Sequence, residues 1–328
     1  MGYTHIKYAD RIVIQKLLAK QYEQKEIARI VGKHPSTISR EIKKNRSGFF
    51  YFANEANQKC KKRRTANNQN KLLSNTELWN DVYEGLINKH SPEQIEGRQK
   101  LLHGANKEKV VSKETIYSMI YYLESKGQKI AHHLRYGKKK RNRRINKQEN
   151  RLLKAKKRSI HKRPKVVNNK KRLGDWEADT VEGSKGTGLI GTFVERKSRY
   201  LVAGMLPTKH SEILNMKARD IFSDIDNNYL HTITCDQGTE FSGYTDLEQI
   251  LNCKIYFADK ASPWQRGLNE NTNGLIRQFF PKKTSFKNVN DVELKKAVAL
   301  LNHRPRKSLG FRTPHEAFWG IKPIALQI

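Results

Sequence analysis

The positive charge of this chain is concentrated in its first half, and this constrains what the chain can fold into and bind. Its 328 residues include 65 Lys and Arg against 32 Asp and Glu, a formal net charge of +33. Residues 173–328 contain 21 basic and 18 acidic residues, which leaves 44 and 14 for residues 1–172. A chain this basic attracts polyanions, and nucleic acid is the first candidate. A ribosome-associated protein and a membrane-surface binder are the alternatives.

The most basic segment is expected to be a linker or arm. Residues 138–172 carry 18 Lys and Arg and a single acid, Glu149, among few apolar positions. A segment of this composition cannot bury enough apolar surface to offset the entropy lost on folding. We therefore expect residues 131–172 to form a basic arm that becomes ordered on DNA, and a solvated tether is the alternative.

The sequence carries no signal for a membrane or an oxidising compartment. No apolar run approaches the roughly 18 residues of a membrane span, and the N-terminus lacks the apolar stretch of a secretory signal. Cys60, Cys235 and Cys253 are widely spaced and odd in number, so neither a disulfide framework nor a zinc site is expected. The expectation is a cytoplasmic protein with no membrane partner.

Residues 1–65 are expected to form a DNA-binding domain with a helix-turn-helix motif. Three short helices are predicted over residues 9–44, with a glycine turn between the second and the third. In the third helix Ile38 and Ile42 share the inward face. The outward side chains that would contact base edges and phosphates are Ser36, Thr37, Ser39, Arg40, Lys43 and Lys44. An ordinary helical hairpin is the alternative.

Residues 66–130 are expected to form a second helical domain. One amphipathic helix is predicted at 77–89, and two more begin after Ser91 and Ser112, which suit N-cap positions. A second helix-turn-helix that reads DNA and a three-helix spacer are equal alternatives for this region.

Residues 173–328 show a different pattern, in which strands alternate with helices. Strands are predicted at 176–181, 189–195, 199–205, 231–235 and 254–258, and helices at 211–222, 246–251 and 268–280. This order predicts a mixed α/β sheet flanked by helices.

Three acids lie where this layout would place catalytic groups. Asp179 is in the first strand, Asp236 ends the fourth, and Glu270 begins the last of these helices. Converging carboxylates are hard ligands for Mg²⁺ or Mn²⁺, and two such ions can activate a hydroxyl and stabilise a leaving phosphodiester oxygen. Structural roles in strand-end turns and at a helix N-terminus are the alternative. Other acids close in sequence are Glu177, Glu182, Glu240 and Asp259.

Longer motifs resemble one family. The segments GDWEADTVEG at 174–183, TCDQGTE at 234–240 and SPWQRGLNENTNGLIRQFF at 262–280 resemble the insertion-sequence-thirty family of DDE transposases, which bacterial insertion sequences encode. YEQKEIARIVGKHPSTISREIKKN at 22–45 resembles the helix-turn-helix of that family. LNHRPRKSLGFRTPHEAF at 301–318 is similar to its C-terminal end.

The resemblance implies a ribonuclease-H-like, retroviral-integrase-like catalytic core at 173–328 with Asp179, Asp236 and Glu270 as its triad. It implies two Mg²⁺ ions, for which Mn²⁺ can substitute, and metal-dependent DNA strand cleavage and strand transfer. The helix-turn-helix would bind the terminal inverted repeats of the element, and target DNA would be the second partner. It further implies a homo-oligomer on DNA, a nucleoid-associated location in the bacterial cytoplasm, and no small-molecule substrate.

Neighbours of the triad also carry expectations. Trp264 is expected either to stack on a base or to pack in the core, while Gln265 and Arg266 contact phosphate or the scissile strand. Asn271 and Asn273 are expected to hydrogen-bond the site or DNA. Asp175 stands where the family commonly has His, and we expect it to add an acid near the site.

Two other functions are open. A non-catalytic helix-turn-helix regulator derived from a transposase needs only the DNA-binding part, and the intact triad argues against it. A general ribonuclease-H-type nuclease needs only the core, and the helix-turn-helix and basic arm argue against it.

Overall fold

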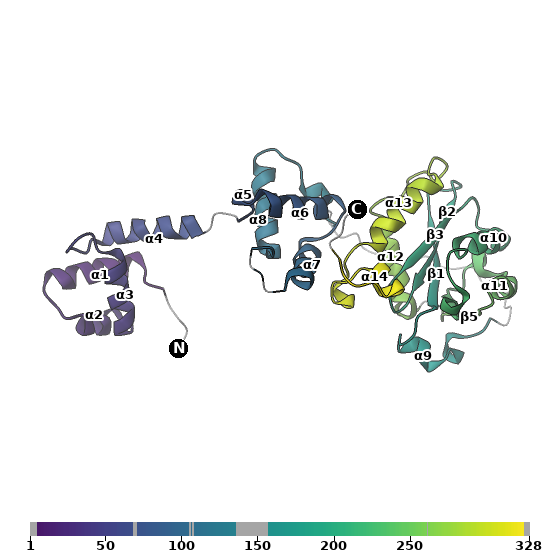
Figure 1. The fold of residues 1–328 in the computed structure, drawn as a ribbon, viewed down its shortest axis with the longest axis horizontal. Helices are drawn as coiled ribbons and strands as arrows, with labels where there is room; N and C mark the ends of the chain where they lie inside the picture. The colour runs from purple at the N-terminus through teal and green to yellow at the C-terminus, as the bar shows by residue number, and fades with distance from the viewer. Residues whose placement is uncertain are drawn as a thin grey trace. The chain divides into compact units, whose positions relative to one another are not determined.

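The computed structural model describes residues 5–67, 71–104, 106, 108–135, 157–260 and 262–324 (Figure 1). The chain forms two compact units, Met1–Asn75 and Thr76–Ile328. Each unit has its own buried apolar residues and is described by itself.

The first unit is helical. Its helices are α1 (Tyr8–Ala19), α2 (Gln24–Val31), α3 (Pro35–Asn45), α4 (Ala53–Asn67) and α5 (Lys71–Ser74). Ile14, Ile27 and Ile38 are fully buried and join α1, α2 and α3 around one core. Helix α2 ends at Gly32, whose φ of +67° suits a residue without a side chain. The predicted helix-turn-helix is therefore confirmed, with α2 and α3 as its two helices.

The second unit begins with three helices, α6 (Thr76–Ile87), α7 (Pro92–His103) and α8 (Lys113–Ser125). The Ser91 and Ser112 side chains accept hydrogen bonds from the backbone of Gln94 and Thr115, so both serines cap helices as the sequence predicted. Of the expected second helical domain at 66–130, residues 76–130 belong to the same compact unit as residues 131–328.

Helix α7 is held to the C-terminal part of the chain by polar and close-packed contacts. Arg98 donates to Glu316 at 2.8 Å, and both side chains are nearly fully buried. Gln94 donates to the backbone oxygen of Pro305 at 2.7 Å. A Cβ at Gly97 would clash with the Phe311 ring, so glycine allows this close approach.

The C-terminal end of the expected basic arm packs on the sheet. Arg158 forms an ion pair with Glu248, and Ser159 makes a parallel bridge to Phe257 at the sheet edge. Arg163 is buried and donates to the Thr234 hydroxyl at 2.8 Å. Residues 157–172 are thus part of the folded unit, because their basic side chains find buried partners there. Residues 136–156 of the expected arm lie outside the described residues.

The sheet has five strands, β1 (Asp175–Glu182), β2 (Leu189–Glu195), β3 (Leu201–Leu206), β4 (Thr232–Cys235) and β5 (Lys254–Phe257). Their order is β3-β2-β1-β4-β5. The β1–β2 and β2–β3 pairs are antiparallel, and the β1–β4 and β4–β5 pairs are parallel. This confirms the predicted mixed five-stranded sheet of ribonuclease-H-like type.

Helices cover both faces of the sheet. The longer helices are α10 (Ser211–Ile221), α11 (Tyr244–Leu251), α12 (Gly267–Ile276) and α13 (Asp291–Asn302), and the shorter are α9 (Lys165–Asn168) and α14 (Pro314–Trp319). Single-turn helices lie at Ala131–His133, Ile160–Lys162, Asn227–Tyr229, Thr239–Phe241, Pro263–Arg266 and Lys307–Leu309. One core lies under α10 and α11 and includes Trp176 and Phe193, and the other lies under α12 and α13 and includes Val181 and Ile190 (Figure 1).

The buried pair between α7 and the C-terminal segment yields a stability prediction. Arg98→Met leaves Glu316 buried without its charged partner, so we expect the free energy of unfolding to fall by about 3–5 kcal/mol. Lys307→Ala is the control, because it removes the exposed pair with Glu93 and should cost under about 1 kcal/mol. Urea denaturation of the full chain measures both, and equal losses in the two variants would contradict the role given to Arg98.

Candidate active site between β1 and β4

Strand pairing brings Asp179 and Asp236 to the same height on adjacent strands. In the parallel β1–β4 pair, Asp175 lies opposite Thr232 and Glu177 opposite Thr234. The same register, carried two residues further, places Asp179 level with Asp236, one residue beyond the end of β4.

Side-chain alternation puts both carboxylates on the face covered by α12. Trp176 and Ala178 on β1, and Ile233 and Cys235 on β4, belong to the core under α10 and α11. Successive side chains of a strand point to opposite faces. Asp179 and the residue after β4 therefore face the other way, toward α12.

A single guanidinium connects the two aspartates. Arg266 donates to the Asp236 carboxylate at 3.0 Å, and its other terminal nitrogen lies 3.7 Å from Asp179. It also donates to the backbone oxygen of Ala178 at 3.1 Å. Two carboxylates that converge in this way repel each other, and the positive charge of Arg266 offsets that repulsion. In the free protein Arg266 thus contacts the two acids.

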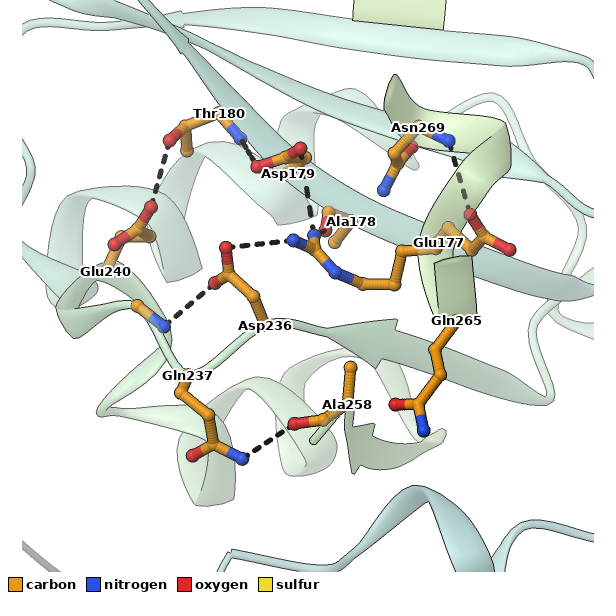
Figure 2. A network of polar contacts seen from close by, with 12 residues as sticks. Glu177, Ala178, Asp179, Thr180, Asp236, Gln237, Glu240, Ala258, Gln265 and Asn269 are labelled. Atoms are coloured by element: carbon orange, nitrogen blue, oxygen red, sulfur yellow. Dashed lines mark hydrogen bonds and ion pairs between the residues drawn. The ribbon is translucent and has the colours of Figure 1, made fainter. Parts of the chain in front are cut away.

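Further donors fix the orientation of each carboxylate (Figure 2). The backbone nitrogen of Thr180 donates to Asp179 at 2.8 Å, and the Asn273 amide donates to the other Asp179 oxygen at 3.0 Å. The backbone nitrogen of Gly238 donates to Asp236 at 2.8 Å. Asp179 is therefore held in place by its own strand and by α12, and Asp236 by the turn that follows β4.

Burial changes the protonation of Asp179. Removal from water raises the pKa of this carboxyl to about 6, with smaller increases from the charges of Asp236 and Glu240. Arg266 and the backbone bond from Thr180 act in the opposite direction. The free protein therefore takes up a proton at Asp179 at a pH well above the usual range of an aspartate.

A third carboxylate beside this pair is Glu240, which sequence reasoning did not select. It is buried and accepts a hydrogen bond from the Thr180 hydroxyl at 2.9 Å (Figure 2). It also lies 3.6 Å from the ammonium of Lys209. Lys157 is a second neighbour that was missed: its ammonium donates to the backbone oxygen of Gln237 at 3.3 Å. Neither side chain carries a distinguishing signal in the sequence.

Glu270 lies in the first turn of α12 with an exposed side chain. Asn273, one turn later on the same helix face, reaches Asp179, so this face of α12 is directed at the aspartate pair. The start of α12 is fixed by buried Glu177, which accepts from the backbone nitrogen of Asn269 at 3.2 Å and pairs with Arg196. Among the described residues, no three His, Cys, Asp or Glu side chains are grouped to hold a metal ion.

Two expectations about neighbouring residues can be compared with the structure. Trp264 is 75% exposed, so core packing is wrong for this side chain. Asp175 was expected near the site, but the structure places it away from the aspartate pair. It is buried, accepts a hydrogen bond from Arg172 at 2.9 Å, and lies four residues from Asp179 along β1. Because a strand rises about 3.3 Å per residue, Asp175 is roughly 13 Å from Asp179. Gln265 donates to Asp259 at 2.7 Å.

The expected DNA-contacting side chains of the first unit lie along α3. Ser39, Arg40, Lys43 and Lys44 are exposed, and Ser36 and Thr37 are half-buried. Arg40 donates to the hydroxyl of Ser36 at 2.9 Å, so its guanidinium lies along the exposed face of the helix. The inward side is held by Glu41, which pairs with Arg11 at 2.7 Å.

Comparisons with known proteins identify the relatives of this chain. Residues 2–45 match the model of a helix-turn-helix domain family. The chain is 35% identical over 321 residues to the transposase InsI of insertion sequence element IS30A from Escherichia coli K12, covering 95% of this chain and 83% of that protein. It is also 35% identical to the transposase of IS4351 from Bacteroides fragilis, covering 96% and 95% of the two chains.

The chain belongs to the IS30 family of transposases. Among solved structures, the catalytic core domain of BIV integrase aligns with 45% of this transposase at 17% identity and a TM-score of 0.37. None of the helices that the structure describes is long and apolar enough to span a membrane.

The pKa of Asp179 yields a pH-dependent prediction. Because the folded protein holds this proton up to about pH 6 and an unfolded aspartate only to about 4, the contribution of Asp179 to stability falls as the pH rises between those values. Asp179→Asn removes this pH-dependent contribution to the free energy of unfolding. We expect the free energy of unfolding of the variant, relative to the parent, to rise by up to about 3 kcal/mol from pH 4 to pH 7.

Denaturation in EDTA, with the variant and parent compared at each pH, measures this difference. Asp246→Asn, which replaces an exposed aspartate of α11, is the matched control. A flat difference for Asp179→Asn would show that burial does not shift the pKa of Asp179.

Proposed function

We propose that this chain is a DDE transposase that binds the terminal inverted repeats of its element and catalyses divalent-metal-dependent DNA strand cleavage and strand transfer. The observation that carries the proposal is the convergence of Asp179 and Asp236 on one cation, on the sheet face that α12 covers. Membership of the transposase family supports DNA as the substrate.

The donor set fits a divalent metal ion. Asp179 and Asp236 present hard carboxylate oxygens, and the site already balances their charge with one cationic group, Arg266. In the proposal Asp179, Asp236 and Glu270 hold Mg²⁺, with Mn²⁺ able to substitute and two ions bound. A metal ion held by these carboxylates would supply activation of a hydroxyl nucleophile and stabilisation of the leaving phosphodiester oxygen.

Other groups of this chain orient the carboxylates and are proposed to contact DNA. Asn273 and the backbone of Thr180 and Gly238 orient the two aspartates, so their geometry exists before DNA binds. Asp179 must lose its proton to act as a ligand, which favours neutral over acidic pH. With the charge of the two carboxylates balanced by bound metal, Arg266 would be available for a DNA phosphate. Exposed Trp264 and neighbouring Gln265 are proposed to contact the scissile strand.

Binding and catalysis are assigned to different units. Exposed Ser39, Arg40, Lys43 and Lys44, with half-buried Ser36 and Thr37, are proposed to contact the inverted repeat. Transposition requires two DNA ends to be held together, so we propose that the active form is a homo-oligomer on DNA.

Carboxylate variants test the catalytic assignment. Asp236→Asn and Glu270→Gln should each abolish nicking and end joining in Mg²⁺, because they remove metal ligands, and leave binding of the ends unchanged. The substrate is a linear duplex that carries the two ends of the element, and the same reaction in EDTA gives the metal-free baseline. Glu212→Gln, an exposed glutamate in the first turn of α10, is the matched control.

Binding of the ends without cleavage by the parent chain in either Mg²⁺ or Mn²⁺ would instead identify a non-catalytic DNA-binding regulator. Loss of binding together with cleavage in Asp236→Asn would contradict its role as a metal ligand.

A second test concerns α3. Arg40→Ala should weaken binding of the inverted repeat by about tenfold or more and non-specific duplex only slightly, because a base contact carries sequence discrimination. Lys16→Ala, an exposed cation on α1, should affect both duplexes little. Fluorescence anisotropy at fixed salt measures these affinities. An equal loss on both duplexes for Arg40→Ala would make it a phosphate contact.

A further inference from the structure

The turn between α3 and α4 exposes an unusual amount of aromatic surface. Phe49 is 98% exposed, Phe50 69% and Phe52 44%. Burying a phenylalanine side chain is favourable, so leaving these rings in water forgoes stabilisation. An exposed apolar group of this kind marks an interaction site.

The turn is held firmly although its tip is exposed. Ser47 and Phe50 exchange two backbone hydrogen bonds of 2.8 and 3.2 Å, and Gly48 takes a φ of +60° between them. The Lys59 ammonium donates to the Ser47 hydroxyl at 2.6 Å. Buried Tyr51 anchors the other side of the turn, because its hydroxyl donates to Glu41 of α3 at 3.2 Å. Phe49 is therefore an apolar tip on a fixed base.

The charges around the turn indicate what it contacts. Residues 43–63 contain seven Lys and Arg and a single acid, Glu55. A second copy of this surface would be repelled by its like charge. A polyanion that also offers an apolar surface fits both features, and stacked bases behind a phosphate backbone combine them.

The distance between the end of α3 and Phe49 fits the spacing between neighbouring grooves of a duplex. The last residue of α3 is Asn45, and Phe49 follows four residues later, so the two are at most about 14 Å apart. A minor groove is roughly 6 Å wide, so this span can cross one backbone from a helix in the major groove.

We propose that Phe49 is a wedge that enters a base step of the minor groove next to the segment contacted by α3, and that it unstacks and kinks the DNA there. Apolar side chains inserted in this way bend DNA and pair with basic side chains on the flanking phosphates. The proposal rests on the proposed function, because it requires the first unit to bind the inverted repeat.

The test uses the full chain and duplexes of the terminal repeat, with 2-aminopurine placed at successive steps and dyes at the two ends. We expect the parent chain to raise 2-aminopurine fluorescence at one step and to shorten the end-to-end distance. Phe49→Ala should lose both signals and bind about tenfold more weakly, and Phe49→Trp should restore them. Tyr8→Ala, an exposed aromatic on α1, is the matched control.

The outcomes separate this proposal from the function on which it rests. If the parent binds the repeat and Arg40→Ala weakens that binding, but Phe49→Ala keeps both signals, the wedge is wrong and the function stands. If the parent shows no preference for the repeat, the proposed function itself fails. Sedimentation without DNA tests the alternative that Phe49 contacts a second copy of this chain. A dimer of the parent that Phe49→Ala dissociates would support that alternative and overturn the wedge.

Discussion

The parallel pairing of β1 with β4 is the constraint on which the candidate active site depends. These strands are separated in sequence by β2, β3 and α10, yet their register decides that Asp179 and Asp236 meet at one height. A shift by one residue would turn one carboxylate toward the core under α10 and α11. The two charges that result from correct pairing need a cationic partner, and Arg266 provides it from the segment just before α12.

The attachment of α12 is the second element of the site, and it uses buried charge. Glu177 lies two residues before Asp179 on the same strand face, where it accepts from the start of α12 and pairs with Arg196. One strand thus carries both a carboxylate of the site and the carboxylate that positions the helix with Glu270. Replacing a buried pair by apolar groups often costs little stability, so its value here lies in fixing where α12 begins.

Local sequence patterns predicted the strands and helices well, but they could not predict contacts between segments that are distant in sequence. Alternation and turn signals located all five strands, and the serine caps located α7 and α8, because these features depend on neighbours in sequence. The bridging by Arg266, the burial of Glu240 and the pair between Arg98 and Glu316 depend on segments that meet only in the fold. Asp175 was misplaced for the same reason, since only the fold brings the Thr232 hydroxyl of β4 to its carboxylate.

The pair between Arg98 and Glu316 joins residues that are 218 positions apart, whereas the helix-turn-helix is complete within Met1–Asn75. During synthesis the first unit can fold as soon as it leaves the ribosome. The second unit must wait for Glu316, and at about 5–20 residues per second this delay is roughly 12–50 s. Each nascent chain therefore passes through an interval in which its helix-turn-helix is formed and its candidate active site is not.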